Sequence, residues 1–167
     1  FRGTTPLAFS AASLGGTVNL LTREPGKKST FSTLVGGGSF GTRKVNATAS
    51  GSFGDWGALI TGSYLGSEGD FPFPDNNGTP LNPFDDETTR RKNNDFNSGD
   101  LLLKATYDGL SIGQLSLLSE FFFNEQGVPG IGSHQSDSVR LKDLRSLNYL
   151  RLDAPDLAGS GFDLRTT

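Results

Sequence analysis

The sequence has 167 residues, of which 34% are hydrophobic and 20% are charged, with a formal net charge of −3 at pH 7. Because it contains no cysteine and a single histidine, it excludes disulfides, cysteine nucleophiles, thiolate metal sites and metal centres with several histidine ligands. No hydrophobic run approaches the roughly 20 residues of a membrane helix, whereas a strand of a membrane barrel needs only about 9–11. The sequence begins at Phe1 and contains no methionine, so we expect a processed product or an internal fragment.

Hydrophobic and polar residues alternate along the chain with a period of two, which is typical of β-strands. The clearest case is residues 44–53, where one face carries apolar or small side chains and the other carries polar ones. The first face holds Val45, Ala47, Ala49, Gly51 and Phe53, and the second holds Asn46, Thr48 and Ser50. Glycine, serine and threonine replace helix formers along most of the chain. In chain order, the pattern predicts strands over residues 30–37, 44–53, 58–66, 101–107, 114–123 and 146–153.

The connections between these expected strands alternate between short and long. Residues 69–97 and 125–140 form long connections, whereas residues 54–57, 108–113 and 155–161 form short ones. An up-and-down antiparallel sheet places successive connections at opposite ends, so the two long connections are expected at one end and the three short ones at the other. Outer-membrane barrels have this arrangement of short turns and long outer loops.

A soluble β-sandwich also alternates, and it is the alternative to a membrane barrel. Two features favour the barrel. The less apolar strand faces are rich in small hydroxyl side chains, which suit a wet lumen, and aromatic residues cluster near the expected strand ends, where an interfacial girdle would lie. These aromatic residues are Phe53, Trp56, Tyr107, Phe121, Phe122 and Phe123. The predicted fold is therefore all-β, a partial antiparallel up-and-down transmembrane β-barrel of about seven strands.

The first 23 residues carry a spaced pattern of glycines, aromatic and β-branched residues. Its fixed points are Arg2-Gly3, Phe9, Gly15-Gly16, Val18-Asn19 and Thr22-Arg23. This pattern resembles the end of the plug domain of TonB-dependent outer-membrane receptors, and residues 37–43 resemble the first barrel hairpin of that family. Ser10 stands where the family commonly has glycine, and Phe9 where it often has tyrosine. The resemblance covers residues 1–53, and beyond them only the rhythm of strands and loops agrees.

The resemblance implies a division into the end of a plug domain, residues 1–26, with a plug strand over 17–23, and the N-terminal part of a barrel, residues 27–167. It implies TonB-dependent uptake of a scarce large ligand, of the ferric siderophore, cobalamin, haem or glycan class, across the outer membrane of a Gram-negative bacterium. The implied partners are the TonB protein complex, whose contact segment lies outside this sequence, outer-membrane lipid, lipopolysaccharide and the small-molecule or metal-chelate ligand. Alternatives are a passive porin-like or adhesin barrel and a soluble all-β binding module.

Arg2 is the one residue of the plug motif to which the resemblance gives an electrostatic role. In the family, this arginine meets carboxylates of the barrel wall, and a buried guanidinium needs such a partner. We therefore expect Arg2 to form an ion pair between plug and barrel, with a solvated surface position as the alternative. Because a receptor of this family performs no covalent chemistry, we expect no catalytic residue and no enzyme activity.

The connection over residues 69–97 is the richest candidate for ligand contact, since loops this long are often functional. The candidate ligand-contact residues are Phe71, Phe73, Asp85, Asp86, Arg90 and Arg91. The arginines could meet anionic ligands or lipopolysaccharide phosphates. The turn at residues 75–78, together with Asp85, Asp86 and Glu87, could hold Ca²⁺, although no full calcium-loop motif is present. Otherwise no metal or cofactor is expected. The alternative to a ligand-binding role for residues 69–97 is a solvated loop whose charges pair among themselves.

Three weaker signals are set aside. The glycine-rich stretch at residues 36–41 is not followed by a helix, so it favours a hairpin over a phosphate loop. His134 near Asp137 lies in a loop of glycine, serine and glutamine, which is typical of a solvated histidine and not of a catalytic triad. Basic residues outnumber acidic ones in residues 1–52, but they stand mostly in pairs near strand ends, so we expect no nucleic-acid partner.

Overall fold

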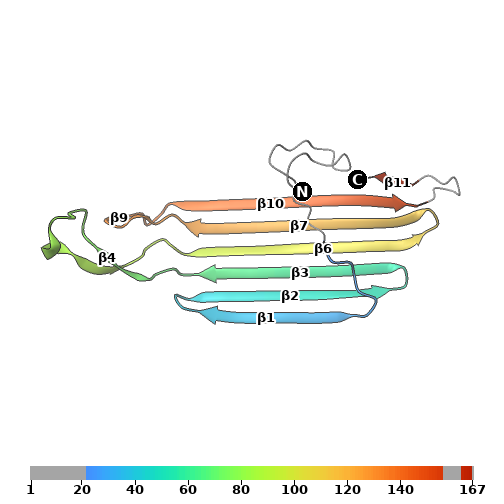
Figure 1. Ribbon diagram of the computed structural model, residues 1–167, viewed down its shortest axis with the longest axis horizontal. Coiled ribbons are helices and arrows are strands. Elements are labelled where there is room, and N and C mark those ends of the chain that lie inside the picture. The colour runs from blue at the N-terminus through green and yellow to red at the C-terminus, as the bar shows by residue number, and fades with distance from the viewer. Residues whose placement is uncertain (1–21, 156–162, 167) are drawn as a thin grey trace, which may run out of the picture.

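The chain folds as one antiparallel β-sheet with two small hairpins beyond one of its ends (Figure 1). The computed structural model describes residues 22–155 and 163–166. The sheet strands are β1 (Thr30–Gly38), β2 (Thr42–Phe53), β3 (Trp56–Ser67), β6 (Phe96–Leu110), β7 (Gly113–Gly127), β10 (Arg140–Ala154) and β11 (Leu164–Thr166). They form a seven-stranded sheet in the order β1-β2-β3-β6-β7-β10-β11. This confirms the all-β fold and the antiparallel pairing of consecutive strands, whereas closure into a barrel stays a prediction.

The strands run further than the hydrophobic alternation predicted. Strands β6, β7 and β10 each have 15 residues. Most of the added residues stand at the end of the sheet that leads into the long connections, where Asn97 pairs with Glu125, and Glu125 with Lys142. Because these side chains are polar, they interrupt the alternation, although the backbone continues to pair.

The two long connections leave the sheet at the same end, as predicted (Figure 1). Both were expected to be loops, but each contains a short hairpin. The first holds β4 (Pro72–Asp75), the 3₁₀ helix η1 (Pro83–Asp85) and β5 (Glu87–Arg90), and the second holds β8 (Gly130–Ile131) and β9 (His134–Gln135). The turns between β2 and β3 and between β6 and β7 lie at the opposite end. Residues 156–161 of the third expected turn lie outside the described residues.

The two faces of the sheet differ in chemistry. Residues directly opposite each other in antiparallel strands project from the same side, and Ala49, Ile60 and Leu103 are opposite one another across β2, β3 and β6. The apolar face is defined by Phe31, Val35, Val45, Ala47, Ala49, Ile60, Leu101, Leu103, Leu117, Phe121, Phe123 and Leu150. The polar face is defined by Asn46, Thr48, Ser50, Thr61, Ser63, Asp100, Lys104, Thr106, Ser116, Glu120, Asn124, Arg145 and Arg151. The same face also carries hydrophobic side chains, among them Leu34, Leu65, Leu102, Phe122 and Leu147. The predicted separation of alternate side chains along β2 is confirmed.

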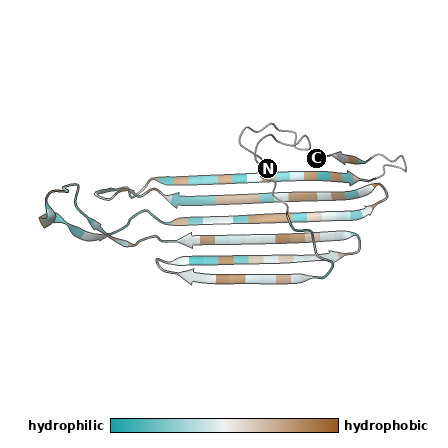
Figure 2. Ribbon diagram, in the orientation of Figure 1, coloured by the Kyte–Doolittle hydropathy of each residue, from teal (hydrophilic) through white to brown (hydrophobic). Residues whose placement is uncertain are grey.

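Almost no hydrophobic core forms within the sheet. Among the described residues, the buried hydrophobic side chains are Leu59 and Ala154, whereas the large side chains of the apolar face are between 36% and 74% exposed. Figure 2 shows the resulting pattern, in which hydrophobic and hydrophilic residues intermingle along the main strands of a single layer. No described residue belongs to a helix that is long and apolar enough to cross a membrane.

Candidate functional site

The two hairpins beyond the sheet are joined to each other by side chains. The amide of Gln135 accepts a hydrogen bond from the backbone N–H of Lys92 at 2.7 Å and donates one to the carbonyl oxygen of Arg90 at 3.1 Å. The guanidinium of Arg91 donates to the carbonyl oxygen of Gly130. Because these contacts link β5 to β8 and β9, the β4–β5 and β8–β9 hairpins form one structural unit.

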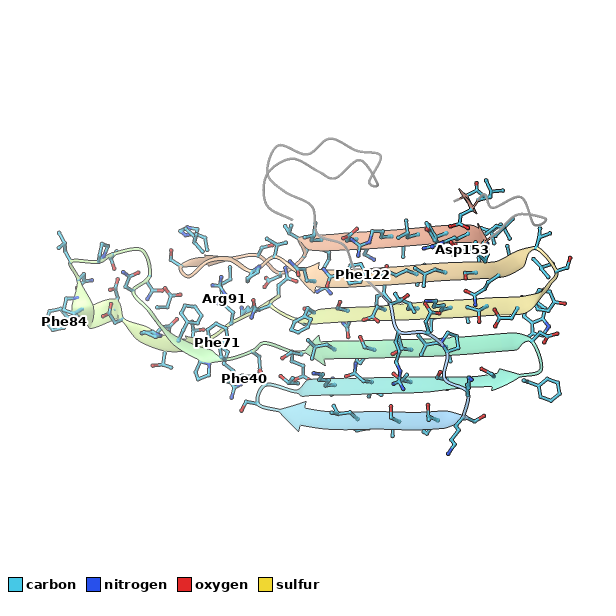
Figure 3. All side chains as sticks on the ribbon, turned by 45° about the vertical axis from the view of Figure 1, so that its right-hand side comes forward. Phe40, Phe71, Phe84, Arg91, Phe122 and Asp153 are labelled. Carbon is cyan, nitrogen blue, oxygen red and sulfur yellow. The ribbon has the colours of Figure 1, made fainter. Side chains whose placement is uncertain are left out.

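An aromatic cluster lies where this unit meets the sheet (Figure 3). The ring of Phe71 makes edge-to-face contacts with Phe40 and Phe73, with centroid separations of 6.1 and 6.4 Å. The guanidinium carbon of Arg91 lies 5.5 Å from the centre of the Phe73 ring, within the range of a cation–π interaction. The structure thus brings together Phe71, Phe73 and Arg91, three of the predicted candidates, and adds Phe40 from the β1–β2 turn.

Arg90, a fourth candidate, also makes its contacts within the protein. Its Nη1 lies 2.6 Å from Oδ2 of Asp70 and donates to the backbone carbonyl oxygen of the same residue at 3.1 Å. The two arginines therefore hold the β4–β5 hairpin to its surroundings. Direct contact of Arg90 or Arg91 with a ligand stays a prediction.

Asp85 and Asp86 lie at the far turn of the β4–β5 hairpin, away from the aromatic cluster. Both carboxylate oxygens of Asp85 lie within 2.8 Å of Oγ1 of Thr79, which donates to them. Leu81 and Phe84 on the same turn are 98% and 96% exposed. Within residues 22–155 and 163–166, no three carboxylate, histidine or cysteine side chains gather into a group that could hold a metal. The structure therefore offers no support for the predicted Ca²⁺ site.

The base of the hairpin unit is held by a bidentate ion pair. Nη1 and Nη2 of Arg140 donate to Oδ1 and Oδ2 of Asp95 at 2.7 and 2.8 Å. The hydrogen bonds from Arg140 hold the pKa of the Asp95 carboxyl below its ordinary value of 3.8. Beside this pair, the side chain of Asn93 donates to the carbonyl oxygens of Val128 and Val139 at 3.2 and 2.9 Å. The end of the first long connection is therefore tied to both ends of the second at one place.

A cavity of about 430 Å³ opens beside this base. Its walls come from the end of β3, the start of β6, the end of β7 and the segments next to them. The lining residues are Ser67, Gly69, Asn94, Asp95, Phe96, Gln126, Gly127, Val128 and Pro129. Many of its polar groups already bond within the protein, since Asn94 donates to the carbonyl oxygen of Gly69 and Gly127 donates to that of Asp95.

A second feature lies on the polar face, where residues 22–29 run across the sheet before β1 begins (Figure 1). We call this segment the strap. Nζ of Lys104 on β6 lies 2.6 Å from Oε1 of Glu24 and 3.2 Å from Oγ1 of Thr22. Further along, the backbone N–H of Gly26 donates to Oγ of Ser50 on β2 at 2.9 Å. The strap therefore crosses from β6 to β2 on the side of the sheet that carries the polar residues.

Several predictions about the N-terminal segment lie outside the described residues. Arg2 falls there, as do residues 17–21 of the expected plug strand, and the two described residues of that strand, Thr22 and Arg23, are not in a β-strand.

Comparison with known proteins found no matching family model, no significant match among curated proteins and no significant match among solved structures.

Proposed function

We propose that this chain is part of a TonB-dependent outer-membrane receptor, which takes up a scarce large ligand with energy supplied from the inner membrane. Residues 27–167 would form about seven strands of the barrel wall, and residues 1–26 would form the end of the plug. The ligand would belong to the ferric siderophore, cobalamin, haem or glycan class. The proposal begins from the motif at Arg2-Gly3 to Thr22-Arg23.

The observation that carries the proposal is the position of the strap relative to the two sheet faces. The strap lies against Lys104 and Ser50 on the polar face, whereas Phe31, Val35 and Val45 on the other face are 72%, 74% and 41% exposed. A plugged barrel requires this asymmetry, because its plug is inside and its outer surface contacts lipid. A soluble sandwich requires the reverse, since its apolar face has to be covered by a second layer.

The margins of the apolar face support the same orientation. At the end with short turns, Trp56 stacks on Tyr107 with a centroid separation of 4.5 Å. At the opposite end, the last row of side chains on this face includes the charged residues Arg43 and Glu125. A strand of about ten residues spans roughly 23 Å when tilted by about 45°, close to the apolar band of about 25 Å in outer-membrane barrels.

In this orientation, the hairpin unit would face the outside of the cell. Its aromatic cluster of Phe40, Phe71 and Phe73 and the exposed turn with Leu81 and Phe84 would be the first surfaces that a ligand meets. The polar face would line the lumen. No step in this function requires the protein to break or form a covalent bond.

The proposal is tested by uptake in cells that carry the intact protein. Four radiolabelled probes represent the ligand classes: a ferric hydroxamate chelate, cyanocobalamin, haemin and a malto-oligosaccharide. We expect accumulation of one probe, which is lost when the gene for the protein or for TonB is deleted and when a protonophore is added. Outer-membrane fractionation of the protein is measured in the same cells.

Two results would contradict the proposal. Passage of several small probes without dependence on TonB or on the protonophore would identify a passive barrel. Recovery of the intact protein in the soluble fraction without detergent would identify a soluble binding module.

A further inference from the structure

The strap is attached to three strands of the polar face. It meets β6 through Lys104, β3 through Gly57 and β2 through Ser50 and Ser52. After Ser29 it continues directly into β1, which pairs with β2. The strap is therefore held by contacts with three strands of the sheet. It is also held at its end, because the chain continues from it into β1.

The contact with Lys104 places a charge where water is largely excluded. Lys104 is only 8% exposed, and its ammonium group bonds to Glu24 and Thr22 at 2.6 and 3.2 Å. The Glu24 side chain is 70% exposed, so the ammonium is the desolvated partner, and loss of its carboxylate would leave that charge uncompensated. Displacement of Glu24 from this position would leave the Lys104 ammonium without its carboxylate, so the pair resists release of the strap.

At Gly26, the strap is held by its backbone. The N–H group donates to Oγ of Ser50 at 2.9 Å, and the carbonyl oxygen accepts a hydrogen bond from Oγ of Ser52 at 3.0 Å. Ser50 is 6% exposed, so its hydroxyl would lose a partner in a largely dry position if Gly26 moved away. Leaving a buried polar group without a hydrogen-bond partner is unfavourable.

Between these two points, the strap passes close to the backbone of β3. A Cβ atom placed on Gly57 would lie 3.0 Å from Cβ of Pro25 and 2.5 Å from Oγ1 of Thr106. The absence of a side chain at Gly57 therefore lets Pro25 approach the sheet. Glycine commonly has this role where two backbones come close together.

We infer that the strap is a fixed anchor: residues 24–29 stay on the wall throughout uptake. This inference rests on the proposed function, because it assigns a limit to the plug movement that such uptake requires. It follows from the three attachments and from the continuation of the strap into β1.

A reversible cross-link tests whether the strap leaves the wall. A Cβ atom on Gly26 would lie 3.9 Å from Oγ of Ser50, so side chains at the two positions are in van der Waals contact. The double variant Gly26→Cys, Ser50→Cys is made in the intact receptor, with each single variant as a control. We expect the oxidised double variant to take up the probe at the same initial rate as its reduced form. Loss of uptake on oxidation, restored by dithiothreitol, would overturn the inference, as would failure of the two cysteines to form a disulfide.

A second measurement is independent of uptake and therefore remains decisive if the proposed function fails. A nitroxide attached at Lys27→Cys, an exposed position on the strap, reports its mobility in the reconstituted intact protein. We expect an immobilised spectrum that becomes mobile with Lys104→Met or Glu24→Gln. Lys142→Met is the matched control, because Lys142 is an exposed lysine that pairs with Glu125 at the far end of the sheet. A mobile spectrum in the parent protein, or no change with both strap variants, would contradict the anchor.

Discussion

Arg140 and Asp95 form a bidentate ion pair although 45 positions separate them in the sequence. Arg140 opens β10, and Asp95 stands immediately before β6. Arg140 also reaches Glu125 on β7, with its Nε 3.6 Å from Oε1. The pair therefore joins the end of one long connection to the end of the other, at the junction between the sheet and the hairpin unit.

The ion pair makes a specific prediction for pH dependence. Because the pKa of Asp95 is lowered in the folded protein from an ordinary value of 3.8, its stabilisation is complete above that value and is lost as pH falls through the lower folded pKa. We expect Asp95→Asn to lower the unfolding temperature at pH 7 and the difference from the parent protein to shrink below pH 4. Thermal unfolding in detergent measures both. Asp86→Asn, at an exposed carboxylate on the distal turn, should have no such effect, and a pH-independent difference for Asp95→Asn would contradict the role assigned to the pair.

The opposite faces of β2 predict unequal tolerance to charge. Ala47 lies on the apolar face and Thr48 on the polar face, where its hydroxyl bonds to that of Thr61 at 2.8 Å. We expect Ala47→Arg to impair outer-membrane assembly more than Thr48→Arg, with a cost of about 2–4 kcal/mol if Ala47 is near the bilayer midplane. The assembled fraction is measured by heat-modifiable gel mobility. Equal assembly of the two variants would be evidence against this assignment of faces.

The close approach of the strap to β3 predicts sensitivity to a single methyl group. Gly57→Ala would force Pro25 or Thr106 to move, and overpacking of this kind typically costs about 1–3 kcal/mol. We expect lower stability and faster proteolysis of the strap. Gly36→Ala is the control, because its added Cβ meets nothing closer than Cβ of Lys44 at 3.9 Å. If Gly57→Ala behaved like Gly36→Ala, the strap would not rest on β3.

The hairpin unit predicts a local effect of Gln135. Gln135→Ala removes one bond to Lys92 and one to Arg90, each worth about 0.5–1.5 kcal/mol at most, and less at an exposed position. We expect faster hydrogen exchange at the amide of Lys92 and in β8–β9, with exchange in β2 and β3 unchanged. Gln126→Ala should leave the hairpins unaffected, because the amide of Gln126 has only a long contact with Asn124, at 3.4 Å. Unchanged exchange in Gln135→Ala would mean that the two hairpins are not coupled through this residue.

The sequence predicted those parts of the fold that depend on local periodicity. Alternation along residues 44–53 separated Ala47 from Thr48, and residues 54–57 were predicted as a short turn between two strands. The two strands do pair, but the pairing extends to Phe53 and Trp56, so the turn is shorter than predicted. It did not predict the ends of β6, β7 and β10, because polar residues such as Asn97 and Glu125 continue backbone pairing without continuing the apolar pattern.

Contacts between distant residues could not be predicted in the same way. The long connection over residues 69–97 predicted Phe71, Phe73 and Arg91 as separate ligand-contact candidates. Their grouping with Phe40 depends on the β1–β2 turn, which lies at the same end of the sheet as that connection. Likewise, the pair between Lys104 and Glu24 joins residues 80 positions apart. Its only signal in the sequence is a lysine within an otherwise hydrophobic and hydroxyl-rich strand.

The central claim is that the apolar face contacts lipid and the polar face lines an interior. It is tested most directly by placing single cysteines at each position from 45 to 50 in the intact protein, on a cysteine-free background. An environment-sensitive fluorophore is attached to each, and the protein is reconstituted into vesicles that contain brominated lipid. The account predicts strong quenching at Val45, Ala47 and Ala49 and weak quenching at Asn46, Thr48 and Ser50. Equal quenching at all six positions, or weak quenching throughout, would contradict it.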